Sequence, residues 1–484
     1  MIENFNFGRV VVLGDLVLDC YINGSVGRIS PEAPVPVLLR AHHTAVPGGA
    51  ANVAMNAATL GCTVELIGLV GCDAPADTLK KTLSGNRNID LSGIVADPAW
   101  TTITKTRVIS GRQQIVRIDE EFIDPIAQET RTRLIDAACR AVGRADVLIC
   151  SDYAKGVLCD DVLEAVIGHA RQLGVPVIVD PKRKDFAAYR GATLVTPNRG
   201  EIAVATGMSL GSDADIERAA REISGQFGGD VLVTRSEEGM TLVRRDGRVT
   251  HARARKSEVY DVSGAGDTVV ATIAGVLSAG QDLETAIVIA TCAASIVVGK
   301  LGTATVTRHE LSAALSAEMR EDGALVSIDR ARALTEGWRH HGARIVFTNG
   351  CFDLIHPGHI SLIRAAARQG DKLVVALNSD TSVARLKGPA RPLQDEQARA
   401  TVIGALRDVD LVVIFDEDTP LETIRALRPD VIVKGSDYQE HEVVGGDIVK
   451  SYGGSVVLVD LVAGRSTTSI VRKMLPGESI STGP

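Results

Sequence analysis

Residues 261–267 combine glycines with a carboxylate in a way that suits phosphoryl transfer. They read DVSGAGD and precede an apolar run with a helical pattern. Glycines at a helix start let backbone N–H groups approach an anion, and the helix dipole favours negative charge there. Asp267 can accept the proton of a hydroxyl that attacks a γ-phosphate, while Gly264, Ala265 and Gly266 surround the phosphates. Taken alone, the same residues suit a tight turn before a helix equally well.

Residues 348–359, TNGCFDLIHPGH, suit a different reaction of a nucleotide. His356 and His359 share one face of the first turn of an expected helix over 360–369. At that position their imidazoles can donate hydrogen bonds to phosphate oxygens. An isolated HxGH could also be a capped helix start or half a metal site. Its place directly after an expected strand over 344–348 and Gly350 favours attack on an α-phosphate with loss of pyrophosphate.

Further segments support each site. For the first, Asp15 follows an expected strand, Gly48, Gly49 and Asn52 stand at another helix start and suit sugar hydroxyls, and Asn198 and Glu201 could organise Mg²⁺ and the phosphates of ATP. For the second, Lys387 lies in a glycine-containing loop, and residues 464–469 open the last expected helix with the hydroxyls of Ser466, Thr467 and Thr468. Arg399 lies within an expected helix, where a solvated charge is the alternative reading.

Buried strands and helices alternate along most of the chain, which predicts an α/β fold. Two series of short β-branched runs indicate two parallel sheets, each with ligands bound outside the carboxyl ends of its strands: 10–13, 147–150, 177–179, 193–195 and 231–233, then 344–348, 373–377, 411–415, 431–433 and 456–459. Residues 35–40 and 105–119 contain no helix, and they predict a small β-layer that acts as a lid or a dimer surface. The expected organisation is a kinase domain over 1–318, a helical linker over 319–342, a smaller transferase domain over 343–476 and a tail over 477–484.

Composition narrows the class of protein. The 484 residues carry a net charge of −8, which argues against a nucleic-acid-binding surface. The eight cysteines form no CxxC pair, so neither a protein-bound metal site nor a disulfide framework is expected. The N-terminal apolar run is too short for a signal peptide, and no stretch suits a membrane span. We expect a soluble cytoplasmic protein.

The motif order in the first 315 residues, GD, GGxxN, NxxE and GAGD, resembles the ribokinase-like carbohydrate kinases over residues 9–315. The resemblance implies a three-layer domain with a small β lid and Asp267 as catalytic base. The glycine signature of that family commonly begins Asp-Thr, whereas here Ser263 supplies the hydroxyl one residue later. Residues 343–474 resemble the HxGH nucleotidyltransferases of the cytidylyltransferase-like group. That resemblance implies a Rossmann-like domain in which a set of residues follows the nucleotide: Thr348, Asn349, Gly350, Phe352 and Asp353.

The two domains in this order resemble a family of bifunctional bacterial enzymes of ADP-heptose synthesis, with supporting segments at 28–37, 151–156 and 386–388. The resemblance implies that heptose 7-phosphate is phosphorylated at O1 by ATP with Mg²⁺. After a separate dephosphorylation, heptose 1-phosphate receives AMP from ATP, and ADP-heptose for the lipopolysaccharide core results. It also implies a homodimer. A phosphorylated sugar needs cations in the kinase pocket, and Arg112 and Lys155, with Arg107 and Arg117, are the candidates unless they are ordinary lid surface.

The sequence leaves two alternatives for the function of the chain. Another sugar kinase could be fused to a cytidylyltransferase for a polyol phosphate, because the motifs do not separate adenine from cytosine. A non-catalytic sensor of sugar phosphates is the other alternative, but every expected catalytic position is filled.

Overall fold

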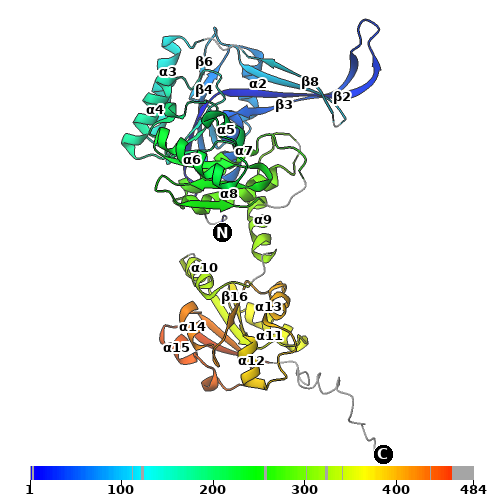
Figure 1. The fold of residues 1–484 in the computed structure, drawn as a ribbon, viewed down its shortest axis with the longest axis vertical. Coiled ribbons are helices and arrows are strands. Elements are labelled where there is room, and N and C mark those ends of the chain that lie inside the picture. The colour runs from blue at the N-terminus through cyan, green and yellow to red at the C-terminus, as the bar shows by residue number, and fades with distance from the viewer. Residues whose placement is uncertain are drawn as a thin grey trace, which may run out of the picture. The chain divides into compact units, whose positions relative to one another are not determined.

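The computed structural model of the chain describes residues 2, 5–111, 113–121, 125–254, 259–300, 302–321, 325–340, 342–436 and 438–460. The chain divides into two compact units, Met1–Leu315 and Ser316–Pro484, which we call the N-terminal and the C-terminal unit. Each unit has its own sheet and its own helices (Figure 1). None of the helices in the described ranges is long and apolar enough to cross a membrane.

The N-terminal unit is built on a ten-stranded sheet in the order β14-β13-β12-β11-β10-β9-β1-β4-β5, with β6 paired to β4. The strands from β12 to β5 run parallel, and β13 and β14 add an antiparallel edge. The strands nearest the site are β1 (Arg9–Gly14), β4 (Thr63–Val70), β9 (Val147–Ser151), β10 (Val177–Asp180), β11 (Leu194–Val195) and β12 (Asp230–Thr234). All five strands expected for the first series are therefore confirmed.

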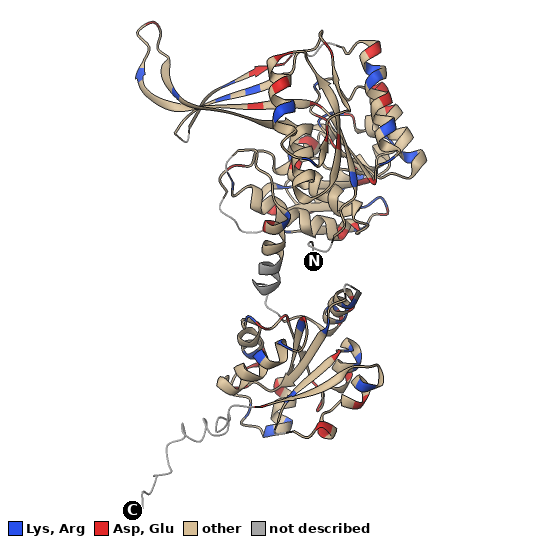
Figure 2. Cartoon of the chain, turned by 180° about the vertical axis from the view of Figure 1, so that it is seen from behind, with Lys and Arg blue, Asp and Glu red and all other residues tan. Residues whose placement is uncertain are grey.

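Helices cover both faces of this sheet, as the apolar character of its strands predicts. One buried apolar cluster contains α1 (Ala50–Leu60), α7 (Ala265–Ser278) and α8 (Leu283–Val297). The opposite cluster contains α3 (Gln128–Val142), α4 (Asp160–Leu173) and α6 (Asp213–Phe227). The three-layer fold predicted for this part of the chain is thus confirmed. In the view of Figure 2, positively and negatively charged residues are mixed along the helices of this unit.

A second, four-stranded sheet in the order β3-β2-β7-β8 extends from the same unit as a ribbon (Figure 1). It consists of β2 (Leu16–Ile29), β3 (Pro36–Gly49), β7 (Ile103–Ser110) and β8 (Gln113–Glu120). The expected β-layer is present, and Gly111, with φ 61°, lies in the turn between β7 and β8. The ribbon is longer than expected, because β2 follows β1 after a single residue, Asp15, and then runs for 14 residues through Asn23 and two glycines.

The C-terminal unit is a doubly wound sheet of five parallel strands in the order β17-β16-β15-β18-β19. Its strands are β15 (Ile345–Gly350), β16 (Lys372–Asn378), β17 (Leu411–Phe415), β18 (Val431–Gly435) and β19 (Ser455–Val459), as the second series of runs predicts. The strand order reverses at β15, which places the ligand crevice at the carboxyl end of that strand. The helices are α11 (Pro357–Ala367), α12 (Asp380–Lys387), α13 (Glu396–Gly404), α14 (Leu421–Leu427) and α15 (Gly446–Ser451).

The stretch expected as a linker, residues 319–342, contains the last residues of α9 (Arg308–Glu321) and all of α10 (Ile328–His340). In the structure α10 is not a free connection. Its residue Ala331 is fully buried, and Leu334 and Trp338 pack against the core of the C-terminal unit. The charged surface of α10 dominates its composition and concealed this apolar stripe.

Candidate functional sites

Asp267 lies in the first turn of α7, with its side chain almost fully buried. Gly264 is the N-cap of this helix and has φ 79°. A Cβ atom at this position would lie 2.8 Å from Asn52 Nδ2. Only glycine combines the left-handed backbone with this close approach. The GAGD segment thus forms the expected helix start and sets the Asp267 carboxylate beside the side-chain amide of Asn52 on α1.

Two side chains donate hydrogen bonds to the Asp267 carboxylate. Asn52 Nδ2 donates to Oδ2 at 2.6 Å, and the Tyr153 hydroxyl donates to Oδ1 at 2.8 Å. Burial raises the pKa of Asp267 to about 6, although both donors lower it. A carboxylate with a pKa close to neutral pH is mostly ionised yet still basic enough to take a proton from an alcohol.

A cavity of about 750 Å³ opens beside Asp267 and brings together the predicted ATP residues. Gly264, Ala265 and Gly266 line one side, and Asn198 and Glu201 line another. Asn198 caps α5 (Arg199–Thr206) and forms a capping box with Glu201, whose Oε1 lies 2.8 Å from Lys182 Nζ.

The same cavity has a group of oxygen ligands suited to Mg²⁺. Asp180, at the end of β10, lines it together with Glu201 and Asn198. Burial, then the charges of Asp267 and Glu201, raises the pKa of Asp180 well above its usual value. A divalent cation between these carboxylates would relieve that repulsion, and Mg²⁺ is usually held by one or two carboxylates and the substrate phosphates. Within the described residues, no group of three or more His, Cys, Asp or Glu side chains is arranged to hold a metal ion by itself.

Asp15, predicted to bind sugar hydroxyls, has another set of partners in the structure. Its side chain is fully buried and accepts three backbone N–H groups, from Tyr153 at 2.9 Å and from Lys155 and Val157 at 3.1 Å. These bonds occupy the carboxylate and fix the loop after β9. Asp15 therefore shapes the site through this loop and does not line the cavity.

Asp19 is the carboxylate that the sequence reading missed. It lies on β2, is 6% exposed, and pairs with Arg107 Nη1 at 2.5 Å. Its charge raises the pKa of Asp267, so the two carboxylates share one region. A Cβ at Gly48 would lie 2.2 Å from Asp19 Oδ2, which explains why glycine is needed there. A single carboxylate between the apolar residues Leu16–Leu18 and Cys20 was the available signal.

The cations expected to hold a sugar phosphate all have acidic partners, as far as the structure describes them. Lys155 Nζ lies 2.6 Å from Glu121 Oε2, and Arg117 pairs with Asp119 at 2.8 Å. Arg112 lies outside the described residues. A phosphate that entered this region would have to compete with these carboxylates.

In the C-terminal unit, His356 and His359 form a stacked pair at the start of α11. His356 is the N-cap of the helix. The two ring centroids are 3.8 Å apart with an interplanar angle of 20°, and the ring of Phe352 lies 4.9 Å from that of His359. Burial, then the charges of His356 and Lys387, lowers the pKa of His359 to about 4. At neutral pH the His359 ring is uncharged and can donate one N–H to a phosphate oxygen.

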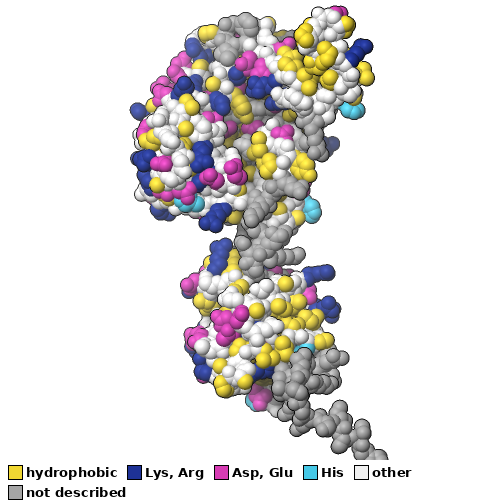
Figure 3. Space-filling model, turned by 45° about the vertical axis from the view of Figure 1, so that its right-hand side comes forward, with side chains coloured by type: hydrophobic (Ala, Val, Ile, Leu, Met, Phe, Trp, Pro, Cys, Tyr) yellow, Lys and Arg dark blue, Asp and Glu magenta, His cyan; other side chains and the backbone are white. Residues whose placement is uncertain are grey.

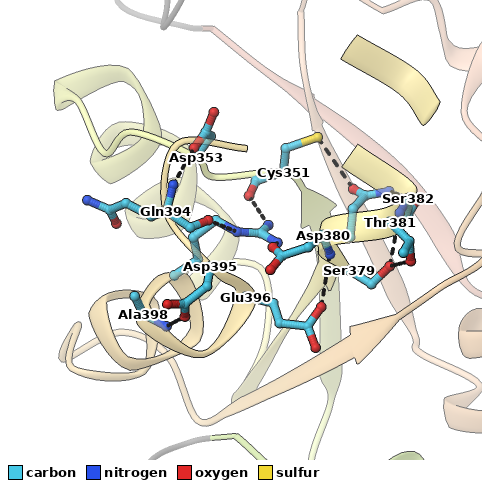
Figure 4. Close-up of polar contacts among 12 residues, drawn as sticks. Cys351, Asp353, Ser379, Asp380, Thr381, Ser382, Gln394, Asp395, Glu396 and Ala398 are labelled. Carbon is cyan, nitrogen blue, oxygen red and sulfur yellow. Dashed lines mark hydrogen bonds and ion pairs between the residues drawn. The ribbon is translucent and has the colours of Figure 1, made fainter. Parts of the chain in front are cut away.

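Asp353 and Arg399 hold the loops around the histidines together. Asp353 is fully buried and accepts Gln394 N at 3.3 Å (Figure 4). It also accepts Leu393 N at 2.7 Å and pairs with Arg391.

Arg399 is 1% exposed, and its three nitrogens donate to Cys351 O, Gln394 O and Asp380 Oδ1. Its place thus differs from the nucleotide contact predicted for it. The guanidinium is engaged by the protein and supports the loops from inside. The solvated alternative also fails.

The remaining predicted residues lie at the end of β15 or beyond the described residues. Thr348 is fully buried, and the Asn349 carbonyl accepts a hydrogen bond from Lys434 Nζ at 3.0 Å. Phe352 is buried and has φ 45°. Ser466, Thr467 and Thr468 lie outside the described residues. Lys434 was missed, although Lys434-Gly435 repeats the Lys-Gly pair that singled out Lys387.

Comparison with known proteins agrees with this architecture. Residues 8–310 match the pfkB family of carbohydrate kinases, and residues 347–482 match the cytidylyltransferase-like family. The chain is 64% identical to "Bifunctional protein HldE" of Gluconobacter oxydans (strain 621H), over 98% of this chain and 99% of that protein. It is 59% identical to the protein of the same name from Azorhizobium caulinodans, with the same coverage.

Solved structures support the fold of the N-terminal unit alone. An Arabidopsis thaliana ribokinase complexed with ribose and ATP has a TM-score of 0.52 and 20% identity, over 64% of this chain and 98% of that one. Phosphofructokinase-2 from Escherichia coli in complex with substrates and products has a TM-score of 0.55 and 21% identity, over 64% of this chain and 98% of that one.

Proposed function

The chain belongs to the HldE family of bifunctional proteins, and we propose that its two sites act on heptose phosphates in separate steps. It is a carbohydrate kinase and a nucleotidyltransferase in one polypeptide. The kinase phosphorylates O1 of D-glycero-D-manno-heptose 7-phosphate. The transferase joins heptose 1-phosphate to AMP from ATP and releases pyrophosphate. The observation that carries this proposal is full-length similarity to two bifunctional relatives, together with a buried carboxylate at the start of α7 and paired imidazoles at the start of α11.

In the kinase, Asp267 takes the proton of the sugar hydroxyl as its oxygen attacks the γ-phosphate. The backbone N–H groups at the start of α7 stabilise the charge on the transferred group, which is the main requirement of phosphoryl transfer. Asn198, Glu201 and Asp180 are the residues that would hold Mg²⁺. When bound, this ion neutralises charge on the phosphates.

In the transferase, no side chain acts as a covalent nucleophile. The sugar phosphate attacks the α-phosphate of ATP, and charge accumulates on its oxygens. His356 and His359 donate hydrogen bonds to these oxygens, and the positive end of α11 adds to the effect. Lys387, whose charge acts on His359, and Lys434, which donates to the Asn349 carbonyl, are the cations that would contact the phosphates.

The exposed ribbon supports a homodimer. Large apolar side chains gather on it (Figure 3): Ile29, Val35, Leu39, Val116 and Ile118. An exposed apolar patch of this kind marks an interaction surface. A second copy of the chain is the proposed partner.

Because both reactions consume ATP, the proposed location is the cytoplasm.

Mass spectrometry of the products tests the proposal. With heptose 7-phosphate and ATP alone, the bisphosphate should accumulate, and an added phosphatase that removes the 7-phosphate should permit formation of ADP-heptose. Formation of the nucleotide sugar from CTP in preference to ATP would instead identify the cytidylyltransferase alternative.

A further inference from the structure

The loop after β9, residues 151–157, is held more firmly than a connection of this length requires. Asp15 accepts the backbone N–H groups of Tyr153, Lys155 and Val157. Asp152 Oδ1 accepts the N–H of Ala154 at 2.7 Å. Two buried carboxylates therefore hold the backbone N–H groups of four residues of this loop.

Asp152 is in turn anchored by two side chains from the segment that follows β10. The Tyr189 hydroxyl donates to Asp152 Oδ2 at 2.8 Å, and Arg183 Nε lies 3.2 Å from the same oxygen. Ala154 has φ 54°, a left-handed conformation that is unfavourable for a residue with a Cβ. Strained backbone of this kind persists where the surroundings over-determine it, and it clusters at functional sites.

The side chain that this loop presents is Tyr153. Its hydroxyl donates to Asp267 Oδ1 at 2.8 Å, and its ring lies under Lys105, with Nζ 5.8 Å from the ring centroid. Burial and the neighbouring carboxylates raise the pKa of Tyr153 well above 10, so the phenol keeps its proton and remains a donor.

We infer that Tyr153 is a positioning residue of the kinase, which holds Asp267 in its productive orientation and sets how readily this carboxylate takes up a proton. This inference rests on the proposed role of Asp267 as the base. Asn52 occupies the other oxygen, so the two donors together fix the plane of the carboxylate. A hydrogen bond to the ionised form stabilises that form.

Other groups also act on Asp267 and must be considered with Tyr153. Asp19, on β2, raises the pKa of Asp267, and Lys105, on β7, lowers it. Asp180, on β10, interacts with Asp267 by charge. Among the donors and charges that face Asp267, Tyr153 can be changed to phenylalanine with little loss of volume and no change of charge.

The test is the pH profile of kcat for ADP release by the full-length kinase, with heptose 7-phosphate and saturating Mg-ATP. Tyr153→Phe should move the acid limb upward by about one pH unit, because one charge-assisted hydrogen bond to the ionised carboxylate is lost. The KM for ATP should change little. Tyr189→Phe is the matched comparison, since it removes a hydroxyl that anchors the same loop without touching Asp267.

A purely structural role gives a different result. If Tyr153→Phe lowers kcat equally at every pH, leaves it unchanged, or shifts the limb no more than Tyr189→Phe does, the inference is overturned. Failure of the proposed function is recognised separately, because Asp267→Asn would then retain kinase activity. Adenylyltransfer by the same preparations reports that the C-terminal unit is intact.

Discussion

In the N-terminal unit the group proposed to act on the substrate is a carboxylate, whereas in the C-terminal unit it is a pair of imidazoles. Both lie in the first turn of a helix that covers a parallel sheet. Burial disfavours the charged form of each group, so it shifts the two pKa values in opposite directions. It raises the pKa of Asp267 to about 6 and lowers the pKa of His359 to about 4.

This difference follows from the chemistry that each site performs. Attack by an alcohol requires that a proton be removed, so the kinase needs a base whose pKa is near neutral. Attack by a phosphate requires no proton removal, since the nucleophile is already ionised. A neutral imidazole that donates a hydrogen bond is sufficient there. The same structural position thus serves proton transfer in one unit and charge stabilisation in the other.

The sharpest separation of the two sites comes from Asp267→Asn. Kinase activity should fall by about a thousandfold or more, because the base is lost, while adenylyltransfer should stay within about twofold of the unchanged enzyme. ADP release and pyrophosphate release measure the two activities. Asp77→Asn, in the first turn of α2 (Ala74–Leu83) and exposed, is the matched control. Loss of both activities in a folded protein would contradict the two-site description.

The reciprocal change is His359→Ala. It should lower adenylyltransfer by about a hundredfold to a thousandfold, which is typical for removal of one donor that stabilises a transition state. Kinase activity should be retained. His441→Ala, an exposed histidine of the same unit, should leave both rates as they are. If adenylyltransfer survived the loss of His359, the imidazoles could not be the principal donors.

A pH titration compares the two sites without any substitution. Asp267 works as the ionised form, and its pKa is raised to about 6, so kinase kcat should fall about tenfold per unit as the pH drops below that value. The pKa of His359 is lowered to about 4, so its ring stays neutral over the same range and adenylyltransfer should show no matching limb. Parallel acid limbs for the two reactions would refute the assignment of opposite roles.

Arg399→Lys probes the support of the second site. Lysine cannot reproduce the three contacts of the guanidinium, and partly buried hydrogen bonds to two loop carbonyls would be lost. The free energy of unfolding of the C-terminal unit should drop by about 2–4 kcal/mol. Urea titration followed by the fluorescence of Trp338, in a Trp100→Phe background, measures this unit by itself. The exposed Arg425→Lys should change the value by less than about 0.5 kcal/mol.

The sheets were predictable because their strands are apolar runs that end in polar residues, a local signal. The long β2 was not, since Asn23 and Gly24 weaken its strand pattern and pairing with β3 and β7 decides its structure. The positions of GAGD and HPGH at helix starts were likewise encoded locally.

The partners of single side chains depended on tertiary structure. Asp15 and Asp19 are both carboxylates four residues apart, and the sequence favoured the first. Only the fold shows that backbone N–H groups from residues 153–157 occupy Asp15, whereas Asp19 lies near the base. Arg399 was chosen for its charge, but one of the two carbonyls that engage it belongs to Cys351, which lies 48 residues away in sequence, and only the fold brings them together.

Gly264 has a consequence for how this enzyme can change over generations. Alanine, the smallest replacement, would strain the backbone at φ 79° and push the Asn52 amide away from the base in a single step. We therefore expect position 264 to remain glycine wherever the kinase is retained, whereas exposed positions around it can be substituted.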